Sequence, residues 1–184
     1  MMIRPSARYA LVMDRPLVPV SPRLTVREAR PGDALAIARV HVASWQAAYQ
    51  TLIPTGRLAR FTVPARTAAW QRNLAERSSV RTTVFDSDQG IVGFASIGSS
   101  RELPGWGELW ALYVAPEAWG RGVGSALFAD AIAALAARGM RRVMLWVLEG
   151  NTRALQFYQG NGFVADGTSK IEDGLPQLRL RWTR

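Results

Sequence analysis

The chain has 184 residues, of which 48% are hydrophobic, so it is long enough to bury a sizeable core as one domain. It has no cysteine and one histidine, which excludes disulfides and a cysteine nucleophile and argues against a zinc site; we expect no bound metal. The net charge is +9, but the arginines are scattered and no nucleic-acid motif is present, so we expect no nucleic-acid partner.

The first 22 residues are rich in proline and predict an arm or linker, with residues 23–184 forming a single domain. This segment carries arginines but no continuous apolar stretch, so it does not resemble a signal peptide. No segment of the chain approaches the ~18 apolar residues of a membrane helix. We therefore expect a cytoplasmic protein without a membrane partner.

The next part of the chain predicts one strand and two helical regions. Alternating residues predict the strand at 24–29, and a helix is expected to start at residues 31–33, where an aspartate suits the positive end of the helix dipole. The residues that follow at helical spacing are Ile37, His41, Trp45 and Tyr49. A second helical region is expected at 57–76, interrupted near Pro64.

The remainder alternates between strands and helices. The expected strands cover residues 82–86, 91–97, 108–114, 143–148 and 177–183. The first two of these form a hairpin around a polar turn. A helix at 124–138 ends at Gly139, a residue type typical of helix C-caps. This helix makes the connection long enough for the strands before and after it to pair in parallel.

Three glycines at alternate positions, Gly120, Gly122 and Gly124, lie between the strand at 108–114 and the helix that follows. Glycines let a ligand approach the backbone, and the first N–H groups of a helix are unpaired and carry the positive end of its dipole. The segment therefore predicts a site for a phosphorylated ligand. It is not a P-loop, because the only lysine of the chain lies far away. It does not match the dinucleotide-binding fingerprint either, because it lacks the third glycine at the required spacing.

Residues 119–124, WGRGVG, resemble the acetyl-CoA signature Gln/Arg-x-x-Gly-x-Gly/Ala of the GCN5-related N-acetyltransferase (GNAT) family. Trp119 departs from the polar residue at the first position, which leaves the backbone part of the motif intact. Residues 151–163 resemble the family's N-x-x-A-x-x-F/Y-Y-x-x-x-G-F block. The resemblance covers the chain well from residue 80 to the C-terminus and more loosely over residues 24–76.

The resemblance implies an α/β fold: a mixed central sheet of about six to seven strands, flanked by helices, whose fourth and fifth strands splay apart. It implies acetyl-CoA as co-substrate, and no metal. The implied reaction moves an acetyl group to a primary amine of a small molecule, by direct attack in a ternary complex. Two alternatives stay open: a peptide or protein amine as acceptor, and a non-catalytic module that binds acyl-CoA for regulation. A homodimer is compatible with each of them.

In the family, backbone groups of the strand before the loop pair with the pantetheine arm, and the loop amides hold the pyrophosphate. Arg121 would reach a phosphate with its side chain, and Asn151 matches the family asparagine near the pantetheine. The cofactor contacts that the resemblance implies are Leu112, Tyr113, Val114, Gly120, Arg121, Gly122, Val123, Gly124, Ser125, Asn151, Ala154 and Phe157.

Two residues are candidates for catalysis. Tyr158 matches the tyrosine proposed to protonate the leaving thiolate, and a phenol with a pKa of ~10 stays protonated at neutral pH; the alternative is that Tyr158 only packs beside Phe157. Glu108 is the candidate general base, acting through a water; the alternative is a solvated carboxylate at a strand end. Protein acetylases of the ribosomal-alanine type often carry a glutamate where this chain has Trp146, which argues against that activity.

The acceptor pocket is expected between the first helices and the loop before the strand at 108–114. His41, Trp45 and Tyr49 are the candidate substrate-binding residues. An aromatic stripe on a helix also occurs as ordinary core, and that alternative stays open, as does a weaker role for His41 as a base. The expected partner is a small-molecule amine.

Overall fold

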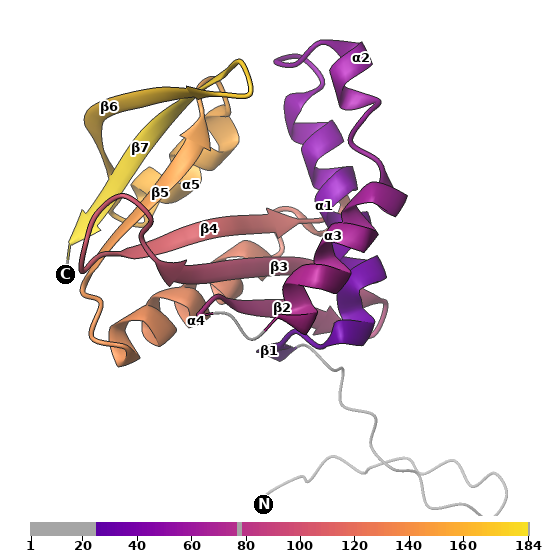
Figure 1. The fold of residues 1–184 in the computed structure, drawn as a ribbon, viewed down its shortest axis with the longest axis horizontal. Helices are drawn as coiled ribbons and strands as arrows, with labels where there is room; N and C mark the ends of the chain where they lie inside the picture. Colours follow the sequence, from indigo (N-terminus) through magenta and orange to yellow (C-terminus); the bar gives the residue numbers. More distant parts are fainter. Residues whose placement is uncertain (1–24, 77–78, 184) are drawn as a thin grey trace, which may run out of the picture.

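The computed structural model describes residues 25–76 and 79–183, so the predicted arm at 1–22 lies outside the described residues. The described strands form one sheet in the order β1-β2-β3-β4-β5-β7-β6 (Figure 1). The strands are β1 (Thr25–Glu28), β2 (Arg81–Ser87), β3 (Gly90–Ser99), β4 (Gly107–Val114), β5 (Arg142–Leu148), β6 (Val164–Glu172) and β7 (Leu175–Thr183). Of the neighbouring pairs in this sheet, β4 and β5 run parallel and the others antiparallel.

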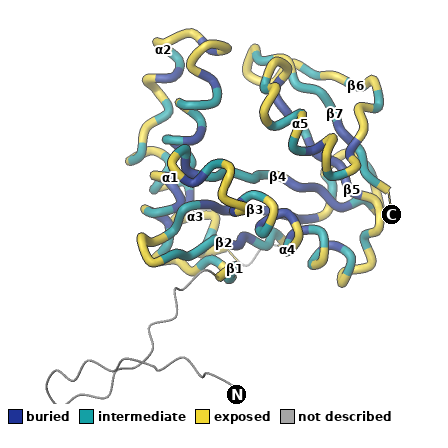
Figure 2. Tube along the Cα trace, turned by 180° about the vertical axis from the view of Figure 1, so that it is seen from behind, coloured by how far each residue is buried: buried dark blue, intermediate teal, exposed yellow. Residues whose placement is uncertain are grey.

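Helices cover both faces of the sheet. They are α1 (Ala34–Tyr49), α2 (Thr55–Leu58), α3 (Val63–Ala75), α4 (Val123–Ala137) and α5 (Thr152–Gly160), with 3-10 turns at Pro31–Asp33 and Pro116–Ala118. On β3, Phe94 packs in the cluster that contains α1 and α3, while its neighbour Ala95 packs in the cluster that contains α4 and α5. Since successive strand residues point to opposite faces, α1 and α3 form one layer and α4 with α5 the other. Buried segments follow the central strands between these layers (Figure 2).

The sheet opens between its two parallel strands. β4 and β5 are in register only at Gly107 with Val143 and Glu108 with Met144, after which they diverge. On the other edge of β4, the register with β3 shifts between Ser96 and Ile97. A bulge of this kind bends a strand and increases its twist. The predicted mixed sheet with splayed fourth and fifth strands is therefore confirmed, and the splay leaves a gap in the middle of the sheet.

Two elements differ from the prediction. β6 was not expected, because most of its residues are exposed, Gly167 interrupts it with a positive φ, and its register with β7 shifts between Ala165 and Ser169. Such an edge strand lacks the alternation by which strands are found. The helical region expected at 57–76 is divided into α2 and α3, and Pro64 lies in the first turn of α3, where a missing N–H costs nothing.

Candidate functional site

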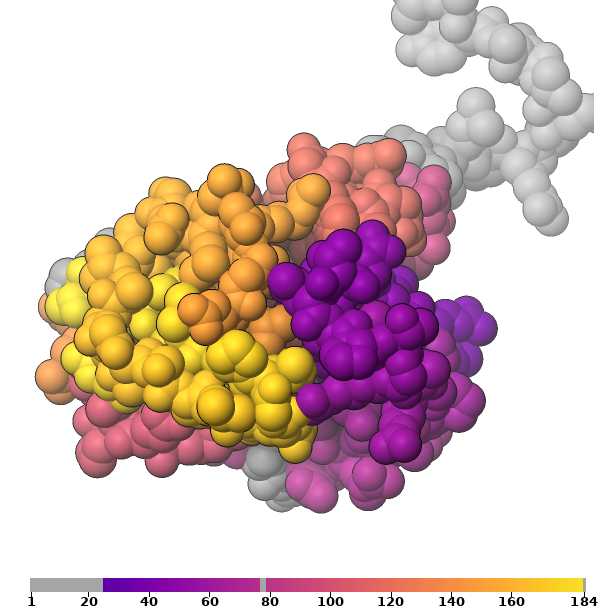
Figure 3. All heavy atoms as spheres, turned by 90° about the horizontal axis from the view of Figure 1, so that it is seen from above, coloured from indigo at the N-terminus to yellow at the C-terminus, as the bar shows by residue number. Residues whose placement is uncertain are grey.

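A cavity of about 1660 Å³ begins where β4 and β5 separate and continues between α1, α2 and the β6–β7 turn. Figure 3 shows a furrow on this side, between the purple N-terminal helices and the orange and yellow C-terminal segments. Most small-molecule pockets enclose ~300–1,000 Å³, so this cavity has room for two ligands. We call its two parts the glycine-loop end, lined by Gly120, Gly122, Gly124, Ser125 and Arg153, and the arginine end, lined by Arg57, Arg60, Phe61 and Arg66.

The glycine-loop end has the backbone of an anion site. Gly120 and Gly122 have φ angles of 73° and 81°, which side chains rarely adopt, and Gly122 is the N-cap of α4. The first helical hydrogen bond joins Ala126 N–H to Gly122 O. The amides of Val123, Gly124 and Ser125 therefore have no acceptor within the helix and are available to a ligand at the positive end of its dipole.

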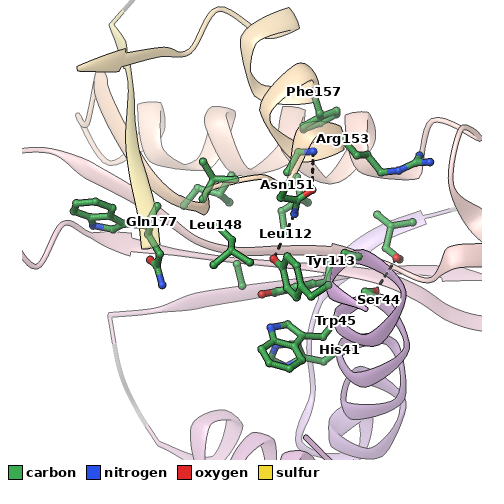
Figure 4. Close-up of a pocket in the computed structure, with 18 of the residues that line it drawn as sticks. His41, Ser44, Trp45, Leu112, Tyr113, Leu148, Asn151, Arg153, Phe157 and Gln177 are labelled. Carbon is green, nitrogen blue, oxygen red and sulfur yellow. Dashed lines mark hydrogen bonds between the residues drawn. The ribbon is translucent and has the colours of Figure 1, made fainter. Parts of the chain in front are cut away.

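Two of the predicted cofactor residues do not line this cavity with their side chains. Arg121 is exposed and lies outside the lining, and the Val123 side chain is buried in the core beside Gly93. A different arginine occupies the cavity wall: Arg153, near the start of α5, has its guanidinium 4.3 Å from the centre of the Trp119 ring. The close-up in Figure 4 shows the Arg153 side chain extending beside Asn151 and Phe157.

Trp119 has a structural partner that explains its presence in the motif. Its Nε1 donates a hydrogen bond of 2.8 Å to the backbone oxygen of Val114, at the end of β4. Ser44 Oγ, on α1, lies 2.7 Å from the same oxygen and 2.6 Å from Val40 O, so its one proton can serve either carbonyl. Trp119 and Ser44 thus join the glycine loop and α1 to the same point of β4.

Only alternate residues of β4 turn their backbone groups toward the gap. Ala115 N–H donates to Val92 O on β3. In an antiparallel pair every second residue bonds to the partner strand, and the residues between them turn their N–H and C=O groups to the opposite side. Tyr113, opposite Phe94, therefore bonds to β3 with its backbone and offers the cavity its side chain. Leu112 and Val114 face the gap, and because the Val114 carbonyl is already hydrogen-bonded, Leu112 and the Val114 N–H carry the free backbone groups.

Tyrosines and an asparagine meet where the strands separate. Asn151 caps α5 by accepting from Ala154 N–H at 3.1 Å, and its Nδ2 donates to Tyr49 Oη at 3.4 Å. Tyr158, about two turns further along α5, is buried and lines the same cavity. Burial, and to a smaller extent the neighbouring Tyr49, raise the pKa of Tyr158 well above its ordinary value. The phenol is therefore a proton donor throughout the neutral range.

Glu108 is buried rather than solvated at its strand end. Its side chain is 3% exposed, and its Oε1 accepts from Arg101 Nη2 at 2.7 Å. Its Oε2 accepts from the backbone N–H of the same arginine at 3.1 Å. Both residues line the cavity. A carboxylate has about four lone-pair sites, so Glu108 keeps the capacity to accept from a water or an amine.

The arginine end combines stacked rings with guanidinium groups. Trp45 on α1 stacks on Phe61 with ring centres 4.3 Å apart and an interplanar angle of 17°. Arg66 lies on Phe61, 4.6 Å from the ring centre. In the described ranges, 25–76 and 79–183, no acidic side chain pairs with Arg57, Arg60 or Arg66.

His41 takes part in packing as well as in lining the cavity. Its ring contacts Phe61, Phe94 and Tyr113, and its Nδ1 accepts from Trp70 Nε1 at 3.3 Å. Burial, with a smaller contribution from the charge of Arg66, lowers the pKa of His41 to about 3. The ring is neutral at physiological pH. The aromatic stripe packs in the core and also lines the cavity, so this geometry is compatible with both alternatives; its residues are His41, Trp45 and Tyr49.

Sequence reasoning missed Ser44, Arg153 and the arginine end. Ser44 carried no signal, because a serine within a helix is common and its partner lies 70 residues away. Arg153 lay inside the block 151–163 and could have been found from its place in the first turn of a helix beside the glycine loop. In the sequence, nothing distinguishes the three arginines of the arginine end from the other basic residues of this basic chain. Only the fold brings Arg57, Arg60 and Arg66 to one cavity.

In the part of the chain that the structure describes, no three side chains of the metal-binding types gather at one point. None of its helices combines the length and the apolar character needed to cross a bilayer.

The chain matches the model of the acetyltransferase (GNAT) family over residues 45–163. It is 37% identical to an uncharacterized N-acetyltransferase of Bacillus subtilis, YuaI, over 74% of this chain and 78% of that protein. It is 31% identical to the peptidyl-lysine N-acetyltransferase YiaC of Escherichia coli, over 57% of this chain and 65% of that protein. Its fold is similar to that of the PaiA N-acetyltransferase of Thermoplasma acidophilum in complex with coenzyme A, with a TM-score of 0.66, 18% identity, and coverage of 86% of this chain and 99% of the other.

Proposed function

The chain belongs to the acetyltransferase (GNAT) family and is an acyltransferase, and from this premise we propose that it moves an acetyl group from acetyl-CoA to the amine of a small molecule. The two substrates would meet in one ternary complex. The observation that carries the proposal is the continuity of the cavity, which joins the glycine loop to a buried tyrosine and a buried carboxylate. The absence of cysteine excludes a cysteinyl-enzyme intermediate, which supports direct passage of the acetyl group to the amine.

The glycine-loop end fits the phosphates of acetyl-CoA. The free amides at the start of α4 would hold the pyrophosphate, and Arg153 replaces Arg121 as the arginine that reaches a phosphate from the cavity wall. The backbone groups of Leu112 and Val114 would hold the pantetheine arm in the gap between β4 and β5. A free N–H there is placed to bind the thioester oxygen, on which charge develops during attack.

Acetyl transfer forms a C–N bond and breaks a C–S bond, so the amine must lose a proton and the leaving thiolate must gain one. Tyr158 supports the second step, because it is buried in the cavity wall and its raised pKa keeps it protonated. Glu108 supports the first, because it lines the cavity and its hydrogen bonds to Arg101 leave lone pairs for a bridging water. Arg101 would hold the Glu108 carboxylate in position.

A small acceptor is favoured over a peptide because the far side of the cavity is covered. Leu175 at the start of β7 packs with Ile53 and Leu58, in a cluster that also contains Leu148 of β5. This contact joins the β6–β7 turn to the α1–α2 segment across the cavity, where a peptide chain would need an open groove. A peptide amine, as the name of the Escherichia coli relative suggests, remains the second candidate.

The proposal is tested by thiol release from acetyl-CoA in the presence of polyamines, amino acids, aminoglycosides and N-terminal peptides. Acceptor-dependent release with a small amine is expected. Binding of acetyl-CoA without release for any member of the panel would overturn it and favour a non-catalytic module. Release with peptides alone would move the assignment to the second candidate.

The cofactor site has its own test on α4. Ser125→Asp places a carboxylate beside the pyrophosphate without straining a glycine backbone, and we expect the Kd of acetyl-CoA to rise at least about tenfold, measured by calorimetry. Ala129→Asp, on the exposed side of the same helix, is the matched control and should leave the Kd unchanged. Equal affinity in the two variants would contradict the placement of the pyrophosphate.

A further inference from the structure

The charges that line the cavity do not balance. In its lining, Arg101 is paired with Glu108, and Lys170 of β6 is paired with Glu172 at 3.0 Å. The arginine end holds three more cations, Arg57, Arg60 and Arg66, and within the described chain no carboxylate lies within ion-pair distance of any of them. The one additional acid of the lining is Asp173 in the β6–β7 turn. An excess of positive charge therefore faces the interior of the cavity.

Arg66 is held in place by rings rather than by an acid. Its guanidinium lies on Phe61, which in turn stacks on Trp45, so a guanidinium and two aromatic planes form one column on the cavity wall. Its Nε is buried and has no hydrogen-bond partner. Buried donors are nearly always satisfied in folded proteins, so this guanidinium lacks at least one of the hydrogen bonds that a folded chain normally supplies. Arg66 also lines the cavity, and its charge there is met by aromatic rings rather than by a carboxylate.

Arg57 and Arg60 approach from the α2 segment. A Cβ atom on Gly174, in the β6–β7 turn, would meet Arg57 Nη1 at 3.7 Å, so the Arg57 side chain spans the cavity toward that turn. Arg60 lies two residues beyond the end of α2 and lines the same end. His41 is close enough for the charge of Arg66 to lower its pKa; its ring is neutral and contributes no further charge.

We propose that the arginine end binds an anionic oxygen group, a carboxylate or a phosphate, carried by the acceptor at the opposite end from its amine. This inference rests on the proposed function, because it assigns a substrate class to the same cavity. The guanidinium fork matches both groups with two parallel hydrogen bonds. An acceptor bound in this way would direct its amine toward Glu108 and the gap between β4 and β5, while the glycine-loop end holds acetyl-CoA.

The test uses amines that differ only in the anionic group: 4-aminobutanoate against butylamine, and 2-aminoethyl phosphate against ethanolamine. We expect kcat/KM to be at least about tenfold higher for one anionic member than for its neutral partner. The carboxylate and phosphate pairs show which of the two groups the site prefers. Equal use of both members of each pair, or a preference for the neutral amines, would overturn the inference even if the enzyme transfers acetyl groups.

Variants assign the preference to the arginine end. Arg66→Gln should lower kcat/KM for the preferred anionic amine about tenfold and leave the KM of acetyl-CoA and the rate with the neutral amine within about twofold. Arg72→Gln, an exposed position on the same helix, is the control and should change neither. If Arg66→Gln lowers the rates with both amines equally, the role of Arg66 is structural and the inference fails.

Equilibrium binding keeps this inference separate from the proposed function. The two anionic amines are titrated into the protein loaded with CoA, and binding is followed by tryptophan fluorescence, since Trp45 lies in the column beneath Arg66. Binding that Arg66→Gln abolishes supports the anionic subsite even if no amine supports thiol release. Absence of binding for both anionic amines overturns the subsite, whatever the outcome of the activity assay.

Discussion

The two ends of the cavity differ in whether backbone groups or side chains form them. The glycine-loop end is made of backbone: free amides at the start of α4 and the gap-facing groups of Leu112 and Val114, all within 14 consecutive residues, 112–125. The arginine end is made of side chains from the α2–α3 segment, which stack on Trp45 of α1. A backbone site depends little on which side chain stands at a position such as 119, whereas the ligand of a side-chain site depends on the side chains present. On the proposed assignment, the donor end would therefore withstand substitutions that change the acceptor.

The comparison predicts that substitutions in different parts of the cavity affect different kinetic parameters. Changes at the glycine-loop end should alter the binding of acetyl-CoA, changes at the arginine end should alter that of the acceptor, and changes between them should alter kcat. Substitutions in the middle of the cavity should therefore have larger effects than those that only loosen the glycine loop.

Tyr158→Phe removes the phenolic proton where the two ends meet, and we expect kcat to fall about 100-fold or more with the Kd of acetyl-CoA unchanged. Activity requires the protonated phenol, and burial raises the pKa of Tyr158. Tyr158 should therefore stay protonated as the pH rises from 7 to 9, and its titration should not lower the kcat of the wild type in that range. Steady-state kinetics across that range and calorimetry with acetyl-CoA measure both quantities. An unchanged kcat would remove the role of proton donor and reduce Tyr158 to a packing residue beside Phe163.

Glu108→Gln keeps the shape of the side chain but removes the proposed base. We expect kcat at pH 7 to fall about 10- to 100-fold. The deficit should shrink toward pH 10, because the acceptor amine, with an ordinary pKa of ~10, then loses its proton without help. The pH profile of kcat for the variant and the wild type, with thermal unfolding of both, is the measurement. A deficit that is the same at every pH, together with a lower Tm, would instead make Glu108 a structural partner of Arg101.

Much of the fold was predictable because its signals are local. The strand at 108–114, the glycine loop and the block from Asn151 to Phe163 each carry their information within about 15 residues. β6 was not predictable, because an exposed edge strand with a glycine bulge has no apolar alternation. The burial of Glu108 and the grouping of the arginines depend on contacts between distant segments. Spacing along the chain predicted the aromatic stripe of α1 that lines the cavity, but it does not encode these contacts, so the arginine end emerged only from the folded structure.

The smallest expected effects concern the bond that fixes the glycine loop to β4. Val114 O accepts from Trp119 Nε1 and lies within reach of Ser44 Oγ, so each single variant, Trp119→Phe or Ser44→Ala, leaves it one donor. Each should cost about 1 kcal/mol or less in the free energy of unfolding, and the KM of acetyl-CoA should rise only a few fold.

The double variant leaves a carbonyl at the edge of the gap without a partner and should cost about 1–3 kcal/mol more than the sum of the two. Urea unfolding of the four proteins in this cycle measures the coupling. Strict additivity would mean that the two donors do not share the Val114 carbonyl. A positive coupling would show that the backbone end of the cavity is held by duplicate side-chain contacts, which is why a tryptophan can replace the usual polar residue there.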